Sequence, residues 1–585
     1  MTGRLIRSAS DNGSEYQYEY DLNNNLTKLR QSTGGSSWTT EYTYDKDNRP
    51  LTAKVNGKTI TDSYNATGTR AKRVYGFSTP YTVALTYLAG ANGSKTGMLQ
   101  SYKNGSEAAY TYAYDDNGNV TSITKGSASA SYTYDALSQL TRVNDGFTNK
   151  TTTYTYDNAG NILERKEYAY TTGALGAPTD TVTYAYDSVW KDKLVSYDGE
   201  AITYDEIGNP LSYRGYTLAW EGKRLQSLSG NNTTASYTYD EQGVRSSKTV
   251  NGVTTTFSYN GSLLMAQVQG SGSSQVKQLY SYDASGQLIS VNYNGTEYYY
   301  LRNGQTDIVG LMDGSGTRVV EYTYDAWGKL ISATGTLATS LGADNPFRYR
   351  GYYYDTETGL YFLMARYYDP EVCRFISADV YMSTGQGVLG GNMWAYCLNN
   401  PANMRDSNGK YPEAVSPWIP PEYYGWLVPA MIGLAPVVAL TAVILSIPLL
   451  CTASTAQPVA QPISQAEVKE KEAEHDIATT ATPPKPKDTV IYRTGSLNYT
   501  NLTPRVVDTE GLSFTTVKPR SGRYFSTTIN TVNSTKVLEA VKDGPTHVSV
   551  RPKNKAELPG WIATRPYATT KPHPYTLLLR YICTK

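Results

Sequence analysis

The first part of the chain repeats one short pattern of alternating positions, Tyr-x-Tyr-Asp, followed by a turn and then Leu, Ile or Val. Neighbouring copies often lie about twenty residues apart, which is the spacing of a repeat architecture. Two tyrosines at positions i and i+2 share one face of a strand, so their rings can stack in rows across successive strands. The pattern therefore predicts one β-hairpin per copy. The clearest copies are Tyr18–Asp21, Tyr42–Asp45, Tyr112–Asp115, Tyr132–Asp135, Tyr154–Asp157, Tyr184–Asp187, Tyr237–Asp240 and Tyr322–Asp325.

The aspartate and the residues after it predict the turn of each hairpin. An Asp side chain at this place accepts hydrogen bonds from backbone amides, and a glycine such as Gly118 supplies a positive φ. One hairpin alone is marginal in water, so the hairpins must pack side by side in a long twisted sheet. A catalytic pair is needed only once, whereas this pair recurs at least eight times, so we assign its Tyr and Asp to structure.

The composition supports an extended, half-wet sheet instead of one packed core. The chain has 54 Tyr but only 8 Phe and 8 Trp, and Tyr buries its ring while its hydroxyl stays bonded or solvated. At 585 residues the chain is too long for a single core and must contain several domains. It enters repeat sequence by Tyr16 with no apolar leader before it, as expected of a chain that begins inside a repeat array.

A second pattern, dense in Gly, Tyr and Asp, fills residues 347–412. Its motifs are Gly351-Tyr352-Tyr353-Tyr354-Asp355, Ala365-Arg366-Tyr367-Tyr368-Asp369-Pro370 and Arg374-Phe375-Ile376-Ser377-Ala378-Asp379. These motifs closely resemble the associated core of RHS (YD-repeat) proteins. The resemblance implies a mainly β fold in which a YD-repeat array, residues 1–346, forms a hollow shell. The core, residues 347–412, would close that shell around a C-terminal cargo domain.

The resemblance also implies a self-cleavage site at the end of the core. Many relatives carry Asp-Pro-x-Gly motifs there, whose two carboxylates activate water and protonate the leaving amine. The matching positions are Asp379 and Asp406, and cleavage would follow Gly409 or Lys410. Both motif prolines are missing here, a departure that leaves a plain turn as the alternative role for Asp406.

Hydrophobicity changes abruptly after the core. Residues 413–456 form a hydrophobic segment in which 425–451 carries no charge and is long enough to span a bilayer. The alternative is a segment buried inside the shell. Residues 457–487 are rich in Ala, Gln, Pro, Thr, Lys and Glu and predict a flexible linker.

The remaining residues, 488–585, lack the repeat and predict a small α+β domain. From Lys487 to Lys585 there are 15 Lys or Arg against 6 Asp or Glu, while the whole chain has a net charge of only +1. The basic balance suits a polyanionic partner. Within the segment His547-Val548-Ser549-Val550-Arg551, a period of two puts the polar residues on one face of a strand.

A histidine, an arginine and hydroxyls on one surface are what metal-free RNA cleavage requires. His547 can transfer a proton, Arg551 can bind the phosphate, and Ser549 and Thr515 can position its oxygens. Arg493 is a further candidate. The competing view is that His547 is a structural strand residue. This stretch also resembles, more weakly, C-terminal toxins with a barnase-like or colicin-like ribonuclease fold.

Other chemistries have less support in the sequence. His-x-Glu with Cys-x-x-Cys is missing, so a zinc deaminase is disfavoured. The four cysteines are widely spaced and form no metal-ligand pattern, so we expect neither metal nor cofactor. The leading alternative is an ADP-ribosyltransferase, with Arg493, a strand at 526–528, and Glu539 or Glu557. A third alternative is a non-enzymatic cell-surface repeat protein.

Taken together, the resemblance and the tail predict a bacterial polymorphic toxin used in interbacterial competition. Its effector would be a ribonuclease acting on RNA, tRNA above all. The family implies a cognate immunity protein as a partner. We expect the chain to be secreted or attached to the cell surface or membrane, the latter through 425–451, and the effector to act in the cytoplasm of a target cell.

Overall fold

The structure is a computed structural model in which two compact units are distinguished, residues 1–451 and 452–585. It describes residues 4–10, 13–90, 95–384 and 387–415 of the first unit, and five strands between residues 490 and 552 of the second. The described residues are almost entirely β-structure, as the sequence predicts.

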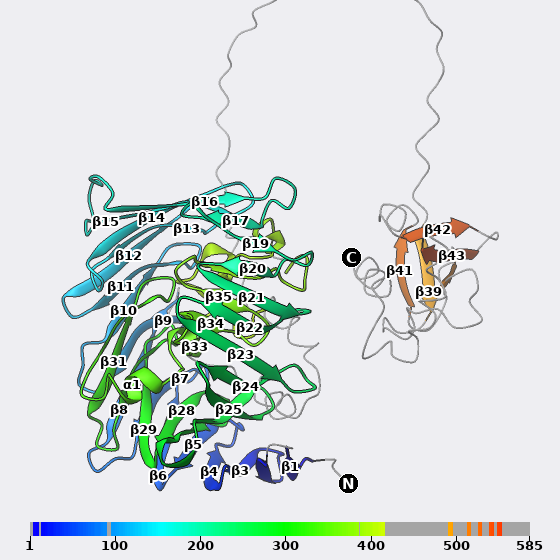
Figure 1. The fold of residues 1–585 in the computed structure, drawn as a ribbon. Coiled ribbons are helices and arrows are strands. Elements are labelled where there is room, and N and C mark those ends of the chain that lie inside the picture. Colours follow the sequence, from blue (N-terminus) through cyan, green and yellow to red (C-terminus); the bar gives the residue numbers. More distant parts are fainter. Residues whose placement is uncertain are drawn as a thin grey trace, which may run out of the picture. The chain divides into compact units, whose positions relative to one another are not determined.

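Two long antiparallel sheets make up most of the first unit, and in both of them each strand pairs with its neighbours in sequence. Figure 1 shows these hairpins succeeding one another in order along the unit. The first sheet, of 18 strands, consists of β1 (Arg7–Ala9), β2 (Glu15–Tyr20), β3 (Leu26–Thr33), β4 (Ser36–Tyr44), β5 (Pro50–Val55), β6 (Lys58–Tyr64), β7 (Arg70–Tyr75), β8 (Tyr81–Ala89), β9 (Lys95–Asn104), β10 (Tyr110–Tyr114), β11 (Val120–Lys125), β12 (Ala128–Tyr134), β13 (Leu140–Asp145), β14 (Lys150–Tyr156), β15 (Ile162–Ala169), β16 (Asp180–Tyr186), β17 (Leu194–Tyr197) and β18 (Glu200–Ala201).

The second sheet has 14 strands and faces the first one. Hydrogen bonds join the two sheets: the hydroxyl of Tyr18 donates to Asn260 at 2.6 Å, and the amide of Gly304, in a turn of the second sheet, donates to the hydroxyl of Tyr112 at 2.8 Å. Its strands are β19 (Thr203–Tyr204), β20 (Pro210–Tyr213), β21 (Tyr216–Glu221), β22 (Arg224–Gly230), β23 (Thr233–Tyr239), β24 (Arg245–Val250), β25 (Val253–Asn260), β26 (Leu263–Gln269), β27 (Val276–Tyr282), β28 (Leu288–Tyr293), β29 (Thr296–Arg302), β30 (Ile308–Met312), β31 (Arg318–Tyr324) and β32 (Leu330–Thr334).

The turns follow the predicted aspartate geometry. In the copy that begins at Tyr154, Asp157 accepts hydrogen bonds from the amides of Ala159 and Asn161, at 2.8 and 2.9 Å. Gly160 between them has a φ of 79°, a conformation that glycine adopts without strain. Asparagine does the same work where it replaces the aspartate, as Asn65 does for Thr67 and Thr69.

The two tyrosines of each copy play different roles, which the alternating pattern did not reveal. The first, such as Tyr237, is buried in the core. The second, such as Tyr239, sits at a β-bulge, where the register shifts by one residue. Ring contacts do occur, as between Tyr184 and Tyr197 on neighbouring strands. In addition, the hydroxyl of the second tyrosine donates to a carbonyl of the preceding hairpin, a hydrogen bond that the alternating pattern did not predict. These bonds run from Tyr44 to Leu26, Tyr64 to Pro50, Tyr114 to Leu99, Tyr134 to Val120, Tyr156 to Leu140, Tyr186 to Ile162, Tyr239 to Leu225, Tyr282 to Leu264 and Tyr324 to Ile308.

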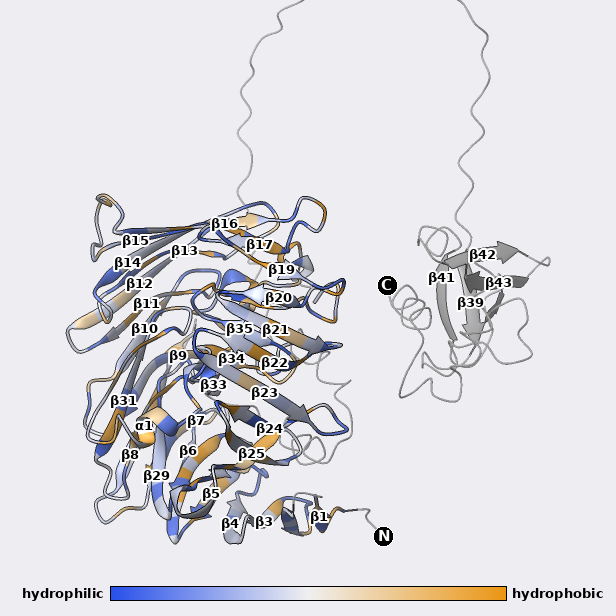
Figure 2. Ribbon diagram, viewed as in Figure 1, coloured by the Kyte–Doolittle hydropathy of each residue, from blue (hydrophilic) through white to orange (hydrophobic). Residues whose placement is uncertain are grey.

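The core segment lies against both long sheets of the unit. A short helix α1 (Leu341–Asp344) precedes the segment, which itself forms a four-stranded sheet; two further strands end the described part of the unit. Figure 2 shows hydrophobic and hydrophilic residues mixed along the strands of the unit, as half-buried sheets require. The core strands are β33 (Tyr353–Asp355), β34 (Leu360–Phe362), β35 (Tyr367–Asp369), β36 (Arg374–Phe375), β37 (Met404–Arg405) and β38 (Glu413–Ala414).

The second unit contains an antiparallel five-stranded sheet with the order β41-β39-β40-β43-β42. The expected helices of an α+β domain fall on residues outside the described ones. The strands are β39 (Val490–Thr494), β40 (Leu512–Thr515), β41 (Tyr524–Thr528), β42 (Leu538–Lys542) and β43 (His547–Pro552).

Candidate functional site

Buried ion pairs fix the core segment inside the first unit. Asp355, fully buried in β33, accepts hydrogen bonds from Arg245 at 2.6 Å and from Lys248 at 2.9 Å, both on β24. Asp369, also fully buried, binds Arg214 at 2.8 Å, although that arginine is only half-buried. Charges buried this deeply are strongly destabilising when one partner is missing. The long sheets therefore depend on the core segment to neutralise their inward-facing cations.

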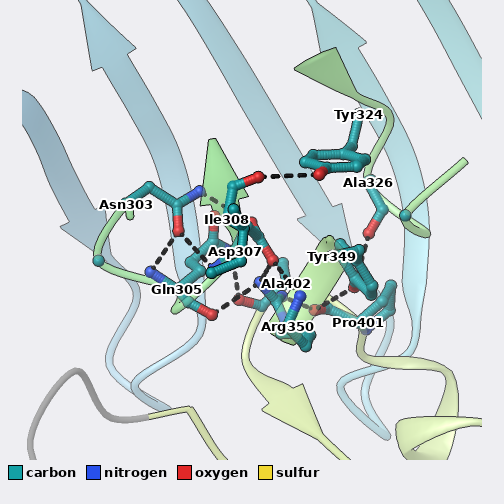
Figure 3. A network of polar contacts seen from close by, with 12 residues as sticks. Asn303, Gln305, Asp307, Ile308, Tyr324, Ala326, Tyr349, Arg350, Pro401 and Ala402 are labelled. Carbon is teal, nitrogen blue, oxygen red and sulfur yellow. Dashed lines mark hydrogen bonds and ion pairs between the residues drawn. The ribbon is translucent and has the colours of Figure 1, made fainter. Parts of the chain in front are cut away.

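A second network, drawn in Figure 3, ties the end of the core to the repeat sheet. Arg350 binds the carboxylate of Asp307 at 2.7 Å and also donates to the carbonyl oxygen of Pro401. Gln305 donates to the carbonyl oxygen of Ala402 at 2.6 Å. The chain is thus held at Pro401 and Ala402, a few residues before the predicted cleavage site.

Asp379 and Asp406, the predicted self-cleavage pair, converge on one arginine. One guanidinium nitrogen of Arg366, Nη2, lies 2.8 Å from Asp379 and 3.5 Å from Asp406. All three side chains are buried. Burial raises the pKa of both carboxyl groups, and the positive charge of Arg366 opposes that rise. The structure therefore assembles two carboxyl groups that resist ionisation around a fixed cation.

The same groups hold both ends of one peptide bond. Arg366 donates through Nε to the carbonyl oxygen of Gly409 at 2.5 Å. Asp406 accepts from the amide of Lys410, the residue on the other side of that bond, at 3.0 Å. Gly409 has a φ of 71°, and a Cβ atom there would lie 2.6 Å from the carbonyl oxygen of Leu363. A side chain at position 409 would clash with this backbone, and the groups on both sides of the bond between Gly409 and Lys410 are held in place.

In the second unit, the backbone register puts most of the candidate residues on one face. His547 lies opposite Thr515, and Ser549 lies opposite Ser513, in the pairing of β43 with β40. Directly opposed residues share a face, as do alternate residues of one strand. His547, Ser549, Arg551 and Thr515 therefore occupy the same face of the sheet.

Arg493 lies differently from the other four candidates. Its neighbour Tyr492 is opposite Thr515, so Arg493 falls on the other face. Glu539, which we considered only for ADP-ribosyl transfer, is opposite Arg551 and joins the His547 face. The register between strands, which a single sequence does not contain, decides both placements.

Comparison with protein families identifies the repeat region. The family model described as Teneurin YD-shell matches residues 125–387, which span repeat hairpins and most of the core. The chain is an RHS/YD-repeat protein. The two-sheet unit described above is therefore a YD shell, and the matched residues include the first part of the segment that the sequence predicts as its core.

Among curated relatives, a tRNA3(Ser)-specific nuclease, WapA, of Bacillus spizizenii is 36% identical over 262 residues, which is 44% of this chain and 11% of the relative. A double-stranded DNA deaminase toxin A of Burkholderia cenocepacia is 25% identical over 333 residues, 49% of this chain and 21% of that protein. The chain thus spans a minor part of these relatives. A solved structure of TcdB2-TccC3-Cdc42 aligns with a TM-score of 0.49 at 18% identity, covering 73% of this chain and 25% of that one.

The remaining sequence predictions concern a membrane-spanning segment and the cysteines. No helix in the described part of the chain is long and apolar enough to cross a membrane, and the candidate segment 425–451 lies outside that part. Cys373 and Cys397 are buried free thiols, and burial raises the pKa of both. Both thiols are therefore held in the protonated, unreactive form.

Arg366 is the functional residue that sequence reasoning missed. It lies in the motif Ala365-Arg366-Tyr367-Tyr368-Asp369-Pro370, which indicated a family resemblance but no role for the arginine. A signal was present, since an arginine inside such an aromatic run is expected to be buried and paired. Its partners are 13 and 40 positions away in sequence, as Asp379 and Asp406, and only the fold brings them together.

Proposed function

We propose that this chain is a bacterial toxin in which a YD shell carries a C-terminal ribonuclease. The observation that carries the proposal is the shared face of His547, Ser549, Arg551 and Thr515 in a strongly basic unit. Several relatives that match the chain are named as tRNA nucleases, which favours tRNA as the substrate. Because the match covers 11% of the first of these relatives, their activity reaches this chain only as a proposal.

The proposed reaction transfers the phosphate within the RNA backbone. The 2′-hydroxyl loses its proton and attacks the adjacent phosphorus, the bond to the 5′-oxygen breaks, and that oxygen takes up a proton. The products are a 2′,3′-cyclic phosphate and a 5′-hydroxyl. His547 serves one of the two proton transfers, Arg551 stabilises the added charge on the phosphorane, and Ser549 and Thr515 position the phosphate oxygens.

Glu539 is suited to the other proton transfer because it shares the face of His547 through its pairing with Arg551. A carboxylate and an imidazole on one surface supply a base and an acid without a metal ion. Arg493, on the opposite face, fits better as a contact to the RNA backbone outside the cleavage centre.

The test is cleavage of labelled tRNA by the purified full chain in the presence of EDTA. We expect fragments that end in a cyclic phosphate, and we expect His547→Ala to remove them. His573→Ala is the matched control, since it changes the other histidine of residues 488–585 and should leave cleavage unchanged. Cleavage that survives in His547→Ala, or that EDTA abolishes, would contradict the proposed mechanism.

The alternatives are less well supported. A deaminase would match the name of one relative, but the chain has only three His and four Cys and lacks the His-x-Glu and Cys-x-x-Cys zinc motifs. ADP-ribosyl transfer would need Arg493 and Glu539 in one site, whereas the register sets them on opposite faces. A purely structural surface protein would give an inert second unit.

The remaining assignments follow from the toxin proposal. A producing cell needs a cognate immunity protein that blocks the ribonuclease. The chain would leave that cell or be displayed on its surface, and the effector would act in the cytoplasm of a neighbouring cell. The uncharged segment 425–451 is suited to contact a membrane during this transfer.

A second proposed function is self-cleavage between Gly409 and Lys410. Two hydrogen bonds favour it: Arg366 donates to the carbonyl oxygen of that bond, and its amide donates to Asp406. Asp379, as a carboxylate, would activate water for attack on the Gly409 carbonyl carbon, while Arg366 stabilises the oxyanion. Protonated Asp406 would give its proton to the leaving nitrogen of Lys410.

Mass spectrometry of the purified full chain tests this second function. We expect a fragment beginning at Lys410 and its loss in both Asp379→Asn and Asp406→Asn. Asp313→Asn, in a repeat turn on the same shell, is the control and should cleave normally. An intact native chain over days at several pH values would contradict self-cleavage and leave Asp406 with a structural role.

A further inference from the structure

The two long sheets of the YD shell meet at a buried cluster of arginines. Arg70 and Arg73 come from β7 of the first sheet, and Arg302 ends β29 of the second. All three have side chains at most 8% exposed. Three guanidinium groups at one seam need compensating negative charge, because an unpaired buried cation is strongly destabilising.

The carboxylates at the seam compensate for only two of the three arginines. Asp62 lies 2.7 Å from Arg73 and 3.2 Å from Arg70. Asp283 lies 2.5 Å from Arg73 and 3.4 Å from Arg70. Both carboxylates are therefore shared by the same two arginines, and the cluster keeps one positive charge.

Arg302 is the arginine left over. Among the residues that the structure describes, none makes a hydrogen bond or an ion pair with its guanidinium group; only its main-chain oxygen is bound, by Asn104 at 2.7 Å. Burial and the neighbouring Arg73 lower the pKa of Arg302, while Tyr102, Tyr75 and the carboxylate of Asp283, which lies beyond ion-pair distance, oppose that fall. A guanidinium that is more than nine-tenths buried thus has no ion-pair partner among the described residues, and the two nearby carboxylates are already bound by Arg70 and Arg73.

A small cavity adjoins this group. It has a volume of about 10 Å³ and is lined by Arg302, Arg70, Arg73, Tyr75, Tyr102 and Gln287, among others. A volume of roughly 10–15 Å³ on this measure holds one water-sized particle. The lining combines guanidinium groups with tyrosine hydroxyls, which are hydrogen-bond donors.

We propose that this cavity binds a single small monovalent anion, chloride being the one of fitting size and charge. The anion accepts hydrogen bonds from Arg302 and from the tyrosine hydroxyls, and it neutralises the remaining positive charge of the seam. Water fits the space as well, but it leaves that charge in place. Sulfate, phosphate and carboxylate ligands are too large for the cavity. The anion thereby joins β7 of one sheet to β29 of the other.

Thermal unfolding of the full chain tests the proposal. The melting temperature of the shell, followed by the near-ultraviolet circular dichroism of its tyrosines, is measured in sodium chloride and in sodium gluconate at equal ionic strength. We expect chloride to raise Tm by about 2 °C or more, because a ligand that binds only the folded state stabilises it. Equal Tm values in the two salts would overturn the proposal.

Two variants separate this site from general salt effects. Arg302→Met should lose the difference between chloride and gluconate, since it removes the uncompensated charge. Arg30→Met is the matched control, because Arg30 on β3 forms an exposed ion pair with Glu19 on β2. This variant should keep the difference in Tm between chloride and gluconate. An unchanged difference in Arg302→Met would overturn the assignment to this cavity.

A crystal of the unaltered chain soaked in sodium bromide gives a test that needs no variant. We expect an anomalous peak within hydrogen-bond distance of the Arg302 guanidinium. A map with bromide elsewhere on the protein and only a water at Arg302 would contradict anion binding.

Discussion

The YD shell and the C-terminal unit use their sequences in opposite ways. In the shell each role is repeated, so that Tyr156, Tyr239 and Tyr324 make the same backward hydrogen bond in three different hairpins. In the C-terminal unit each candidate residue occurs once, and His547 is one of only three histidines in the chain. Repetition allows a structural role to be recognised from sequence, whereas a single residue acquires a chemical role only from its neighbours in space.

The charge distribution shows the same division. The shell buries its charges in pairs, as Arg245 with Asp355. By contrast, residues 487–585 contain 15 basic but only 6 acidic residues. Paired charges hold the sheets in register, and unpaired positive charge attracts a polyanion. The two regions should therefore respond independently to mutation.

The largest expected effect lies in the C-terminal unit. His547→Ala should reduce RNA cleavage by about 10²–10⁴-fold, the usual contribution of a general acid or base. The unfolding transition of the shell should not move. A variant that loses activity and also destabilises the shell would break the division between the two regions.

The largest effect within the shell should come from breaking a buried ion pair. Asp355→Asn leaves Arg245 and Lys248 without their full counter-charge and should lower the free energy of unfolding by about 3–5 kcal/mol. Denaturant unfolding of the shell measures this loss. RNA cleavage below the unfolding transition should stay unchanged, and Asp313→Asn in an exposed turn serves as the control.

The acid sensitivity of the shell should follow Asp283. Arg73 and Arg70 hold the pKa of this carboxyl at about 2 in the folded state, below its usual value. Its ionised form therefore stabilises the fold above about pH 4, by about 2–3 kcal/mol, and this contribution is lost as the pH falls from about 4 to 2. The destabilisation caused by Asp283→Asn should accordingly be largest at neutral pH and shrink as the pH falls from about 4 to about 2. A destabilisation independent of pH would refute this account.

The smallest expected effect is the difference in stability between variants of the two tyrosines of one repeat. Tyr239→Phe loses the hydrogen bond to the carbonyl of Leu225, at 2.8 Å, and should destabilise the shell by about 1 kcal/mol. The hydroxyl of Tyr237 is buried without a hydrogen bond, so Tyr237→Phe should be neutral or stabilising. Equal losses in both variants would mean that the tyrosines are interchangeable after all.

The sequence predicted the hairpins and the turns because both rest on contacts local in the chain, whereas the core was predicted from a resemblance. Asp157 finds its partners within four residues, and a repeated pattern exposes such contacts. The bulge that turns Tyr239 toward the preceding hairpin depends on strand register, which alternation alone does not specify. Alternation therefore did not predict the hydrogen bond that joins each repeat to the preceding one.

The candidate sites show the same limit. Asp379 and Asp406 were predicted from a resemblance, but their shared partner Arg366 was not. In the C-terminal unit, period-two alternation grouped His547 with Ser549 and Arg551. The pairing of β39 with β40 puts Tyr492 opposite Thr515. Arg493, the next residue, therefore falls on the other face of the sheet, which alternation within one strand did not reveal. Contacts between distant strands are the information that one sequence lacks.

Expression of residues 488–585 alone, under tight induction in bacteria, tests the central claim most directly. Growth is followed together with total RNA on a denaturing gel, for the unaltered unit and for His547→Ala and Glu539→Gln. The account predicts growth arrest with discrete RNA fragments that disappear in His547→Ala. Growth arrest with intact RNA, or normal growth despite a folded soluble unit, would contradict it.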